Sequence, residues 1–487
     1  MNILFVCSEV FPLIKTGGLA DVSYSLPRAL ADLGHQVTVV LPGYRSVRAR
    51  LGEPDQRRSL PDDFLRSDIR VAEYASSPVG VPLLLVESDS LFDRDGGPYE
   101  RSSGDPWPDN ADRFAQFCRA VVSWVVAAEQ AGAGYQVVHC NDWQTGLIPA
   151  LLSLHESAVK TLFTIHNLAY QGVFDYATFQ HLQLPDTWWH LDALEFYGNL
   201  SFLKAGIVFA DWVTTVSPTY ADEILREPAA CGMGGLLQHH QNKLVGILNG
   251  ADYEIWNPQT DDHILFHFDR DSLEQKLKNK LDLQRISGLR LSKSAPLIGL
   301  VSRLVEQKGI DWVVSAMTAT QEHKVQWVIL GSGTPHYEQQ LLELAQANPK
   351  TVSVTIGYDE ELAHRIEAGS DLFAMPSRYE PCGLNQIYSL RYGTLPIVRR
   401  TGGLADTVVN VDELSLEQGT ATGFVFEEPA AAAFTDTVLR AIAMYSRRKT
   451  WQRIQQTAMA QCFDWQHSAQ SYLELYQQDH QQDHQQE

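Results

Sequence analysis

The sequence predicts an α/β protein made of two doubly wound, parallel-sheet domains. Its 487 residues exceed the length at which a single hydrophobic core stops growing, about 250 to 300 residues. Short apolar runs rich in branched side chains alternate with helical stretches, which is typical of parallel strands covered on both faces. This rhythm breaks at a polar stretch after Asn249 and then starts again. We therefore expect one sheet in each half of the chain.

The apolar runs place the predicted strands in order. They lie at residues 3–7, 37–41, 83–86, 137–140, 162–165 and 213–216 in the first half, and at 297–301, 327–330, 352–356, 372–375 and 395–398 in the second. Between the first two runs, residues 19–33 have the spacing of an amphipathic helix, which Gly34 ends. Ligands of doubly wound sheets bind beyond the carboxyl ends of the strands, so two facing sheets predict one cleft.

A hexapeptide, Thr-Gly-Gly-Leu-Ala-Asp, occurs at residues 16–21 and again at 401–406, although the surrounding residues do not repeat. Six matching residues can arise by chance or by convergent loop chemistry, so we infer no repeat architecture. The segment 477–487 is polar and of low complexity, which predicts a frayed tail.

Charge and cysteine usage exclude several classes of partner. The chain has 38 Lys+Arg against 59 Asp+Glu, a net charge of −21, so nucleic acid and anionic membrane surfaces are repelled. Six cysteines without a Cys-x-x-Cys pair predict reduced thiols and a cytosolic or stromal compartment. The first apolar run follows no basic start and ends at Glu9, so we expect neither a signal peptide nor a membrane span.

The sequence offers no set of metal ligands. It lacks a His-Glu-x-x-His pattern, and His239 and His240 are adjacent, so their side chains diverge. Two His and two Asp residues of the tail can share a helical face, namely Asp479, His480, Asp483 and His484. We interpret these four as a solvated tail and expect no structural or catalytic metal.

Two segments place cations beside glycine-containing turns. Lys15-Thr16-Gly17-Gly18 precedes the first predicted helix and is typical of an anion cradle, in which free amides and the helix dipole favour phosphate. Taken alone, it is equally a glycine turn with a solvated lysine. Arg303 and Lys308 follow the first strand of the second half, where guanidinium and ammonium groups can bind phosphate oxygens. Surface loops often carry such residues, but their position at the carboxyl end of a strand favours a role in ligand binding.

Two further segments follow predicted strands. Residues 375–386 lead from a strand through a loop that carries Glu380 to a helix expected to open at Gly383. Glu380 is a candidate catalytic carboxylate, with helix capping as the alternative, and Cys382 is expected to be a small buried thiol without a chemical role. His166 ends a strand of the first half, where a merely hydrogen-bonded histidine is the commoner case.

Together these motifs resemble the bacterial glycogen synthases and plant starch synthases of glycosyltransferase family 5. The resemblance extends from Ile3 to about Tyr476, and six segments in the same order make it specific. The matching segments are residues 15–22, 166–167, 249–250, 302–309, 380–384 and 401–404. The residues Cys140-Asn141-Asp142 differ slightly from the family pattern, but the phosphate motifs and the Glu380 motif do not.

The resemblance implies a GT-B fold with two Rossmann-like domains facing across a cleft. Residues 1–248 are expected to form the acceptor-side domain and 249–462 the nucleotide-sugar-binding domain. Residues 463–487 are expected to form a helix that crosses back to the first domain, plus the polar tail. The implied reaction is retaining transfer of glucose from ADP-glucose to the non-reducing 4-hydroxyl of an α-1,4-glucan such as glycogen, in the cytoplasm. No metal, pyridoxal phosphate or other cofactor is implied.

The resemblance also assigns site residues. Glu380 is expected to hold the donor sugar or support its positive charge, His166 to contact the donor glucose, and Arg303 and Lys308 to stabilise the departing diphosphate. The donor is expected to contact Lys15, Gly17, Gly18, Tyr358 (against adenine), Cys382, Gly383, Leu384, Thr401, Gly402 and Gly403. The acceptor glucan is expected to contact Asp21, Tyr99, Asp142 and Asn249.

Three alternatives stay open from the sequence. The enzyme can use another nucleotide sugar, because residues alone do not separate ADP-glucose from UDP-glucose. It can be a phosphorylase, although such enzymes are normally much longer and need pyridoxal phosphate on a lysine. It can also be a non-catalytic glucan-binding protein on the same scaffold, since a fold does not fix a function. The oligomeric state is likewise open.

Overall fold

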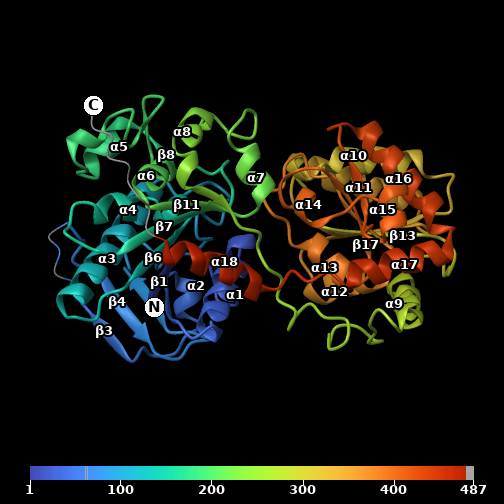
Figure 1. Ribbon diagram of the computed structural model, residues 1–487, viewed down its shortest axis with the longest axis horizontal. Coiled ribbons are helices and arrows are strands. Elements are labelled where there is room, and N and C mark those ends of the chain that lie inside the picture. The colour runs from blue at the N-terminus through green and yellow to red at the C-terminus, as the bar shows by residue number, and fades with distance from the viewer. Residues whose placement is uncertain (61, 63, 479–487) are drawn as a thin grey trace. The chain divides into compact units, whose positions relative to one another are not determined.

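The computed structural model describes residues 1–60, 62 and 64–478 (Figure 1). They form two compact units. The first unit contains Met1–Asn249 and the C-terminal segment that begins at Trp465, and the second contains Gly250–Asp464. The predicted boundaries, after residues 248 and 462, lie one and two residues before the points at which the chain passes between the units. Most of the predicted tail lies outside the described residues, including His480 and His484.

The large sheet of the first unit has the strand order β12-β11-β7-β6-β1-β2-β5-β4-β3. Its strands are β1 (Asn2–Val6), β2 (Gln36–Pro42), β3 (Gln56–Arg58), β4 (Arg70–Tyr74), β5 (Leu83–Glu87), β6 (Val137–Asn141), β7 (Lys160–Ile165), β11 (Trp212–Thr215) and β12 (Leu244–Gly246). All pairs from β12 to β5 are parallel, as predicted, and the apolar side chains of β1 are fully buried. The expectation of a purely parallel sheet is wrong at one edge, where β4 and β3 pair antiparallel.

Helices surround the sheets of the first unit (Figure 1). They are α1 (Gly18–Asp32), α2 (Arg45–Arg48), α3 (Asn110–Gln130), α4 (Leu147–Leu152), α5 (Tyr176–His181), α6 (Phe202–Phe209), α7 (Pro218–Glu223), α8 (Gly234–His239) and α18 (Trp465–Gln477). The predicted first helix is confirmed, and Gly34 ends it with a φ of 88°. A small antiparallel sheet joins β8 (Val173–Phe174), β10 (Asn199–Ser201) and β9 (Glu195–Phe196).

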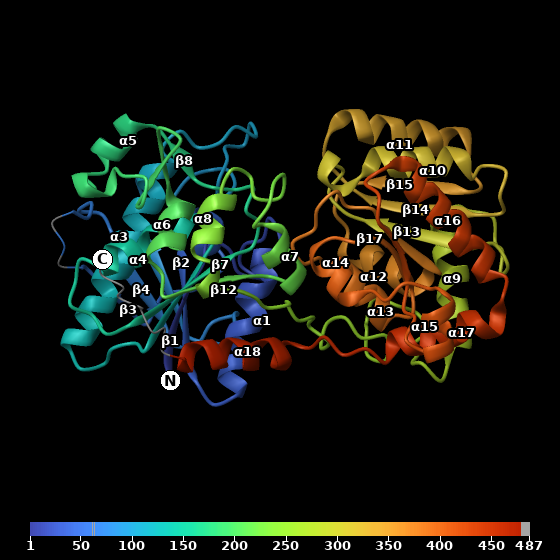
Figure 2. The ribbon, with the colours of Figure 1, turned by 45° about the horizontal axis from the view of Figure 1, so that its top comes forward.

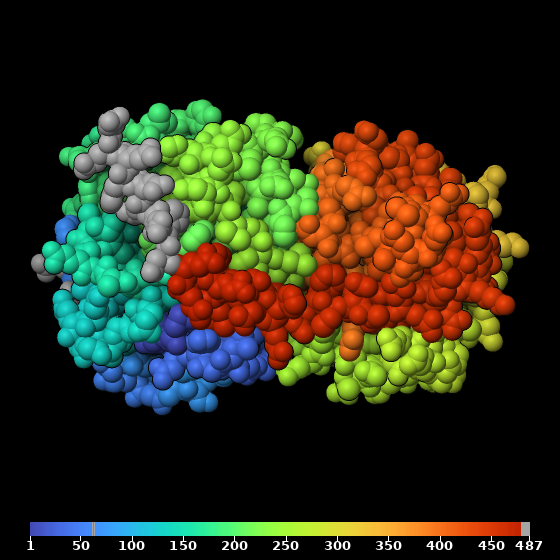
Figure 3. Space-filling model, viewed as in Figure 1, coloured from blue at the N-terminus to red at the C-terminus, as the bar shows by residue number. Residues whose placement is uncertain are grey.

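The C-terminal helix α18 packs beside α1 in the first unit (Figure 2) and forms part of its surface (Figure 3). Its predicted apolar face is buried, and consists of Trp465, Ala469, Tyr472, Leu473 and Tyr476. The Tyr476 hydroxyl lies 2.7 Å from Nδ1 of His139 on β6, and Ser468 donates to the carbonyl of Leu248 at 2.6 Å. The far end of the chain is therefore part of the first unit.

The sheet of the second unit is parallel throughout, with the order β15-β14-β13-β16-β17-β18. Its strands are β13 (Leu297–Val301), β14 (Gln326–Gly331), β15 (Val352–Ile356), β16 (Leu372–Met375), β17 (Leu395–Arg399) and β18 (Phe424–Phe426). Taken in order along the chain, this is the 3-2-1-4-5-6 arrangement of a Rossmann sheet. The first unit repeats it, because β5, β2, β1, β6, β7 and β11 follow the same order.

Side chains that alternate along β14 show how the second sheet is covered. Trp327 and Ile329 join the core beneath α10 (Ile310–Ala319), α16 (Ala431–Tyr445) and α17 (Arg448–Met459). Val328 and Leu330 join the opposite core beneath α9 (Leu273–Ile286), α12 (Glu360–Gly369) and α14 (Gly402–Thr407). The remaining helices are α11 (Pro335–Ala347), α13 (Asn385–Arg391) and α15 (Glu413–Gln418). Among the described residues, no helix is long and apolar enough to span a membrane.

In each unit the chain order reverses between the first and fourth strands of the 3-2-1-4-5-6 arrangement. These are β1 and β6 in the first unit and β13 and β16 in the second. Loops that leave two such strands diverge and open a crevice at the carboxyl edge of the sheet. The loops after β1, β13 and β16 carry the cation and Glu380 motifs, so the fold places them at these two reversal points.

Candidate active site

Glu380 and Lys308 meet at the strand reversal of the second unit. Glu380 lies in the loop after β16 and is 6% exposed, and Lys308 ends a short 3-10 helix, Glu306–Lys308, after β13. The Lys308 ammonium lies 2.5 Å from Oε2 of Glu380, and the Ser377 hydroxyl donates to the same oxygen at 2.9 Å. The two loops that flank the reversal are therefore joined by a charged pair at the point where a doubly wound sheet binds its ligand.

The loop that carries Glu380 is braced from its other side. Arg378 donates to both carboxylate oxygens of Asp311 on α10, each at 2.8 Å, and its guanidinium lies 4.5 Å from the centre of the Trp312 ring. This pairing lowers the pKa of Asp311 and raises that of Arg378. Arg399 donates to the carbonyl of Ser377 at 3.2 Å. These contacts fix the backbone on which Glu380 sits.

Two predicted residues of the second unit are exposed. Arg303 follows β13 and, in the part of the chain that the structure describes, its guanidinium has no hydrogen-bond or ion-pair partner. Tyr358, two residues beyond β15, is 73% exposed. A free guanidinium and an exposed ring, each beyond the carboxyl end of a strand, are available to a ligand.

The predicted helix start at Gly383 is wrong by two residues. The helix α13 begins at Asn385, and Gly383 has a φ of 73°, a conformation that favours glycine and interrupts a helix. Within the described residues, the backbone amides of Gly383 and Leu384 have no hydrogen-bond acceptor. Cys382 is buried, as expected. The anion-binding amides that the sequence predicts are therefore in a turn that leads into the helix.

The second hexapeptide packs behind this turn. Thr401, Gly402 and Gly403 are all buried, and α14 begins at Gly402. A Cβ atom on Gly402 would overlap the carbonyl oxygen of Glu380, and one on Gly403 would overlap that of Cys382. The amide of Gly403 donates to the carbonyl of Pro381 at 3.1 Å. These contacts support the turn, and direct contact of the three residues with the donor stays a prediction.

The first hexapeptide does not form the free anion cradle that the sequence predicts. Lys15, Gly17 and Gly18 are exposed, but the Lys15 ammonium pairs with Asp21 at 2.8 Å. The amides of Thr16 and Gly17 are not free, because both donate to the Glu9 carboxylate, the latter at 3.3 Å. The Thr16 hydroxyl donates to Glu9 as well, at 2.6 Å. A carboxylate of the chain itself therefore occupies the first part of the predicted anion cradle.

Tyr99 completes the contacts of Glu9. Its hydroxyl donates to Oε1 of Glu9 at 2.6 Å and lies 2.7 Å from Oγ of Ser8. Glu9 is 3% exposed and was not singled out from the sequence. The sequence offers one signal for it, an acidic residue three positions beyond a buried strand. Its role as an acceptor depends on amides seven and eight residues further on, which no local pattern indicates.

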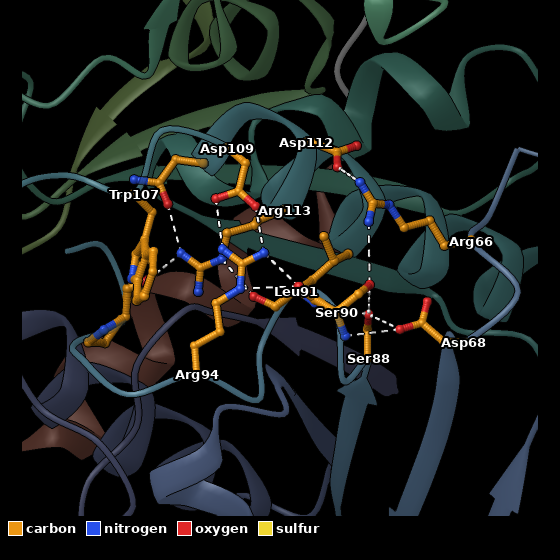
Figure 4. A network of polar contacts seen from close by, with 12 residues as sticks. Arg66, Asp68, Ser88, Ser90, Leu91, Arg94, Trp107, Asp109, Asp112 and Arg113 are labelled. Carbon is orange, nitrogen blue, oxygen red and sulfur yellow. Dashed lines mark hydrogen bonds and ion pairs between the residues drawn. The ribbon is translucent and has the colours of Figure 1, made fainter. Parts of the chain in front are cut away.

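Arg94 and Arg113, which Figure 4 shows in a polar network, lie beside the segment that carries Tyr99. The buried guanidinium of Arg113 on α3 donates to the carbonyls of Leu91 and Pro98, each at 2.9 Å. Arg94 binds both carboxylate oxygens of Asp109, at 2.8 and 2.6 Å. The position of the Tyr99 hydroxyl is therefore set by a polar network, and its contact with the glucan stays a prediction.

His166 and Asp142 lie together beyond β7 and β6. Nε2 of His166 lies 2.9 Å from Oδ1 of Asn141, an acceptor, which assigns the ring proton to Nε2. The His166 amide donates to Asp142 at 2.8 Å. Only part of the His166 ring is exposed, and desolvation lowers its pKa to about 3, so the ring is neutral. Desolvation also raises the pKa of Asp142 to about 7, and its φ of 57° is uncommon for a residue other than glycine.

Asn249 is the last residue before the chain enters the second unit. It is 6% exposed, and its Oδ1 has no hydrogen-bond partner within the described residues. A buried amide oxygen without a donor costs free energy unless water or a ligand satisfies it. In the described part of the chain, no group of three or more His, Cys, Asp or Glu residues is arranged to hold a metal ion.

The structure thus brings some of the predicted residues into contact within each unit. Glu380, Lys308 and the turn at Gly383 lie together in the second unit, where Arg303 and Tyr358 are available but touch none of them in the contacts described. In the first unit, Lys15 contacts Asp21, and His166 contacts Asp142.

Comparisons with known proteins agree with the resemblance seen in the sequence. A family model for the starch synthase catalytic domain matches residues 2–239, and one for glycosyl transferases group 1 matches residues 286–457. The chain is 49% identical to a glycogen synthase of Cellvibrio japonicus, over 98% of both chains. It is 48% identical to glycogen synthase 2 of Nitrosococcus oceani, over 98% of this chain and 97% of the relative.

A solved structure confirms the GT-B fold. The catalytic domain of starch synthase IV from Arabidopsis thaliana, bound to ADP and acarbose, superimposes with a TM-score of 0.85 at 31% identity, over 98% of both chains. Relatives of this similarity span nearly the whole chain and match both of its units. The chain therefore belongs to the glycogen and starch synthase family of glycosyltransferases.

Proposed function

We propose that the protein is a retaining glucosyltransferase that moves glucose from ADP-glucose to the non-reducing 4-hydroxyl of an α-1,4-glucan, as in glycogen synthesis. One observation carries the proposal. The Lys308–Glu380 pair bridges the two loops at the strand reversal of a sheet in a chain 48–49% identical to proteins named glycogen synthase. The similar structure of the starch synthase IV catalytic domain holds ADP and acarbose, which fit ADP-glucose as the donor and an α-1,4-glucan as the acceptor.

The positive groups of the site suit a departing nucleoside diphosphate. Negative charge grows on the diphosphate as the glycosidic bond breaks, and groups already in place stabilise it best. Lys308 and Arg303, together with the free amides at Gly383 and Leu384, supply such groups in the second unit, and Lys15 supplies one in the first. Removing one donor of this kind typically costs about 10²-fold to 10³-fold in rate. Because these groups supply the charge, we propose that neither a metal nor another cofactor is required.

Glu380 and His166 act on the sugar in this proposal. The Glu380 carboxylate, held by Lys308 and Ser377, supports the positive charge that develops on the transferred glucose. The neutral His166 ring donates to Asn141, so its other ring nitrogen or its backbone carbonyl is available to a sugar hydroxyl. We further propose that Tyr358 stacks on adenine and that Asp21, Tyr99, Asp142 and Asn249 contact the glucan.

An assay of the unmodified protein tests the proposal. ADP release is measured with ADP-glucose and glycogen, without added Mg²⁺, and we expect release that depends on the glucan. Faster release from UDP-glucose would identify the alternative donor, whereas glycogen binding with no release from either donor would identify a glucan-binding protein. Absence of both release and glycogen binding contradicts the proposal entirely.

The variant Glu380→Gln tests the role of the carboxylate. We expect turnover to fall by about 10²-fold or more while donor binding is largely kept, because the charge is needed only as the transition state forms. Glu343→Gln, on the exposed face of α11, is the matched control. Near-normal turnover of Glu380→Gln would show that the Glu380 carboxylate has no role in the mechanism.

A further inference from the structure

We infer that Gln386 is a positioning residue, which aims the backbone amides of Gly383 and Leu384 at the donor diphosphate. The inference rests on the proposed function, because it assigns a device for binding that donor. Gln386 is the second residue of α13 and is fully buried. A buried carboxamide is costly unless its hydrogen bonds are made, so its partners indicate its role.

The carboxamide nitrogen of Gln386 holds the turn before α13. Nε2 donates to the carbonyl oxygens of Cys382 and Gly383, both at 3.0 Å, and lies 3.3 Å from Oγ1 of Thr407 on α14. The Thr407 hydroxyl donates in turn to the carbonyl of Gly403 at 2.6 Å, which leaves its lone pairs for Gln386. Two successive carbonyls of the turn are therefore drawn toward one buried nitrogen.

This arrangement fixes the direction of the two amides. In a trans peptide the C=O bond and the following N–H bond point in opposite directions. Because the carbonyls of Cys382 and Gly383 point at the buried Gln386, the amides of Gly383 and Leu384 point away from it. Both residues are partly exposed, and within the described chain neither amide has an acceptor. Two successive unpaired N–H groups that face away from the core of a turn are an anion-binding arrangement.

The carboxamide oxygen ties Gln386 to Gly383 itself. Oε1 of Gln386 has no hydrogen-bond partner among the described residues, and it lies 2.5 Å from where a Cβ atom of Gly383 would be. Any side chain at residue 383 would push Gln386 away, in addition to the strain of a φ of 73°. Gln386 therefore leaves one of its own buried atoms, Oε1, unpaired while its Nε2 pairs the carbonyls of Cys382 and Gly383. An apolar side chain would remove the first cost but would leave those carbonyls without their donor.

The test compares two buried glutamines of the same unit. Gln386→Met keeps the approximate volume and removes both N–H donors. Gln284→Met is the matched control, because Gln284 on α9 is also fully buried and its Nε2 donates to Ser292 and Gln326, at 2.9 and 2.6 Å. Gln326 begins β14, so the control site lies at the edge of the sheet opposite the turn.

We expect Gln386→Met to lower kcat/KM for ADP-glucose by about 10²-fold, with a higher KM for the donor and an unchanged KM for glycogen. Gln284→Met is expected to lose stability but to keep its donor KM. Equal donor KM values in the two variants would overturn the inference while leaving the proposed function intact. A wild-type protein without ADP release would contradict the proposed function itself.

Gln386→Glu keeps the inference testable if Gln386→Met does not fold. Its carboxyl can donate one hydrogen bond only when protonated, and burial raises the pKa of a carboxyl group. We expect the donor KM of this variant to exceed that of wild type at about pH 8 and to approach it as the pH falls to about 6. A donor KM equal to wild type at both pH values would overturn the inference.

Discussion

The hexapeptide at residues 16–21 and its copy at 401–406 each follow a strand and begin a helix, but their glycines have different surroundings. Gly17 and Gly18 are exposed, and a Cβ atom on either would meet no other atom within 4 Å. Gly402 and Gly403 are buried, and a Cβ atom on either would overlap a carbonyl of the loop that carries Glu380. The fold therefore explains the glycines of the second copy but not those of the first.

The carboxylates beside the two copies differ in the same way. Glu9 accepts from the amides of Thr16 and Gly17, so it holds its loop from inside. Glu380 accepts side-chain donors from Lys308 and Ser377 and leaves the nearby backbone amides free. The same two glycines are thus required by packing at residues 402 and 403, whereas at residues 17 and 18 they have open space beside them. This difference points to a ligand at Gly17 and Gly18.

Gly403→Ala is expected to have the largest effect. The new methyl group would overlap the carbonyl of Cys382, so the loop of Glu380 must move. Overpacking of this kind costs about 3 kcal/mol of unfolding free energy, and we expect activity to fall by about 10²-fold or more. Denaturant unfolding and ADP release measure the two effects. Wild-type stability would show that the second copy is not needed for packing.

Two histidines, one in each unit, differ in the pH at which they lose their proton. His166 is kept neutral by desolvation, whereas His364 on α12 lies 2.8 Å from Asp261. Burial opposes the charge on His364, but Asp261 together with Glu360 raises its pKa to about 9. Since the pKa of an unfolded histidine is about 6.5, the pair contributes its full stability below that pH and loses it as the pH rises through about 9. The contribution is about 3 kcal/mol.

The variant His364→Gln measures that contribution. We expect the difference in unfolding free energy between wild type and His364→Gln to be largest near pH 6 and to shrink toward about pH 10. The side chains of His364 and Asp261 are each 1% exposed, so added salt is expected to change the difference little. A difference that does not depend on pH would show that His364 is neutral in the folded protein.

Glu9→Gln is expected to have the next largest effect. The variant removes the negative charge and replaces one carboxylate oxygen with an NH₂ group, so it can no longer accept from the amides on one oxygen and from the Thr16 and Tyr99 hydroxyls on the other at the same time. We expect a loss of about 2 kcal/mol in stability and about 10²-fold in kcat/KM for the donor. The control is Glu53→Gln, whose carboxylate is 89% exposed. If both variants behave alike in kinetics and unfolding, Glu9 has no role in shaping the loop.

Gly18→Ala is expected to have the smallest effect, and one of opposite sign in stability. Alanine fits the start of α1 without a clash and restricts the unfolded chain, which stabilises by about 0.4 to 1 kcal/mol. We expect the donor KM to rise about tenfold, because the methyl group takes space needed by the ligand. Unfolding curves and initial rates test both. An unchanged donor KM would show that the donor does not contact Gly18.

The sequence predicts the sheets well because parallel strands buried on both faces are continuous apolar runs. It misses β3, which consists of the exposed residues Gln56, Arg57 and Arg58 and has no apolar signal. It also misses β8 and β9, of two residues each, because so short a strand has no periodicity. Local patterns therefore identify the longer apolar strands, the edge strand β15 included, but miss strands that are as short or as exposed as these.

The candidate site is predictable where the motif itself supplies the chemistry, as at Glu380 and Lys308. It is not predictable where the chemistry depends on which partner a group finds after folding. Glu9 acts through amides seven and eight residues further along its own loop, and the carboxamide of Gln386 acts on backbone carbonyls. The two copies of the hexapeptide show the same limit, because one sequence has two roles that only the surrounding structure separates.

Hydrogen exchange of the unmodified protein, with and without ADP, tests the difference between the two copies most directly. The two hexapeptides have the same sequence, so their intrinsic exchange rates are closely matched. We predict that residues 401–406 exchange slowly without ADP, and that residues 16–21 exchange faster and are slowed by ADP more than residues 401–406 are. Equal rates without ADP, or slowing by ADP at 401–406 alone, would contradict the account.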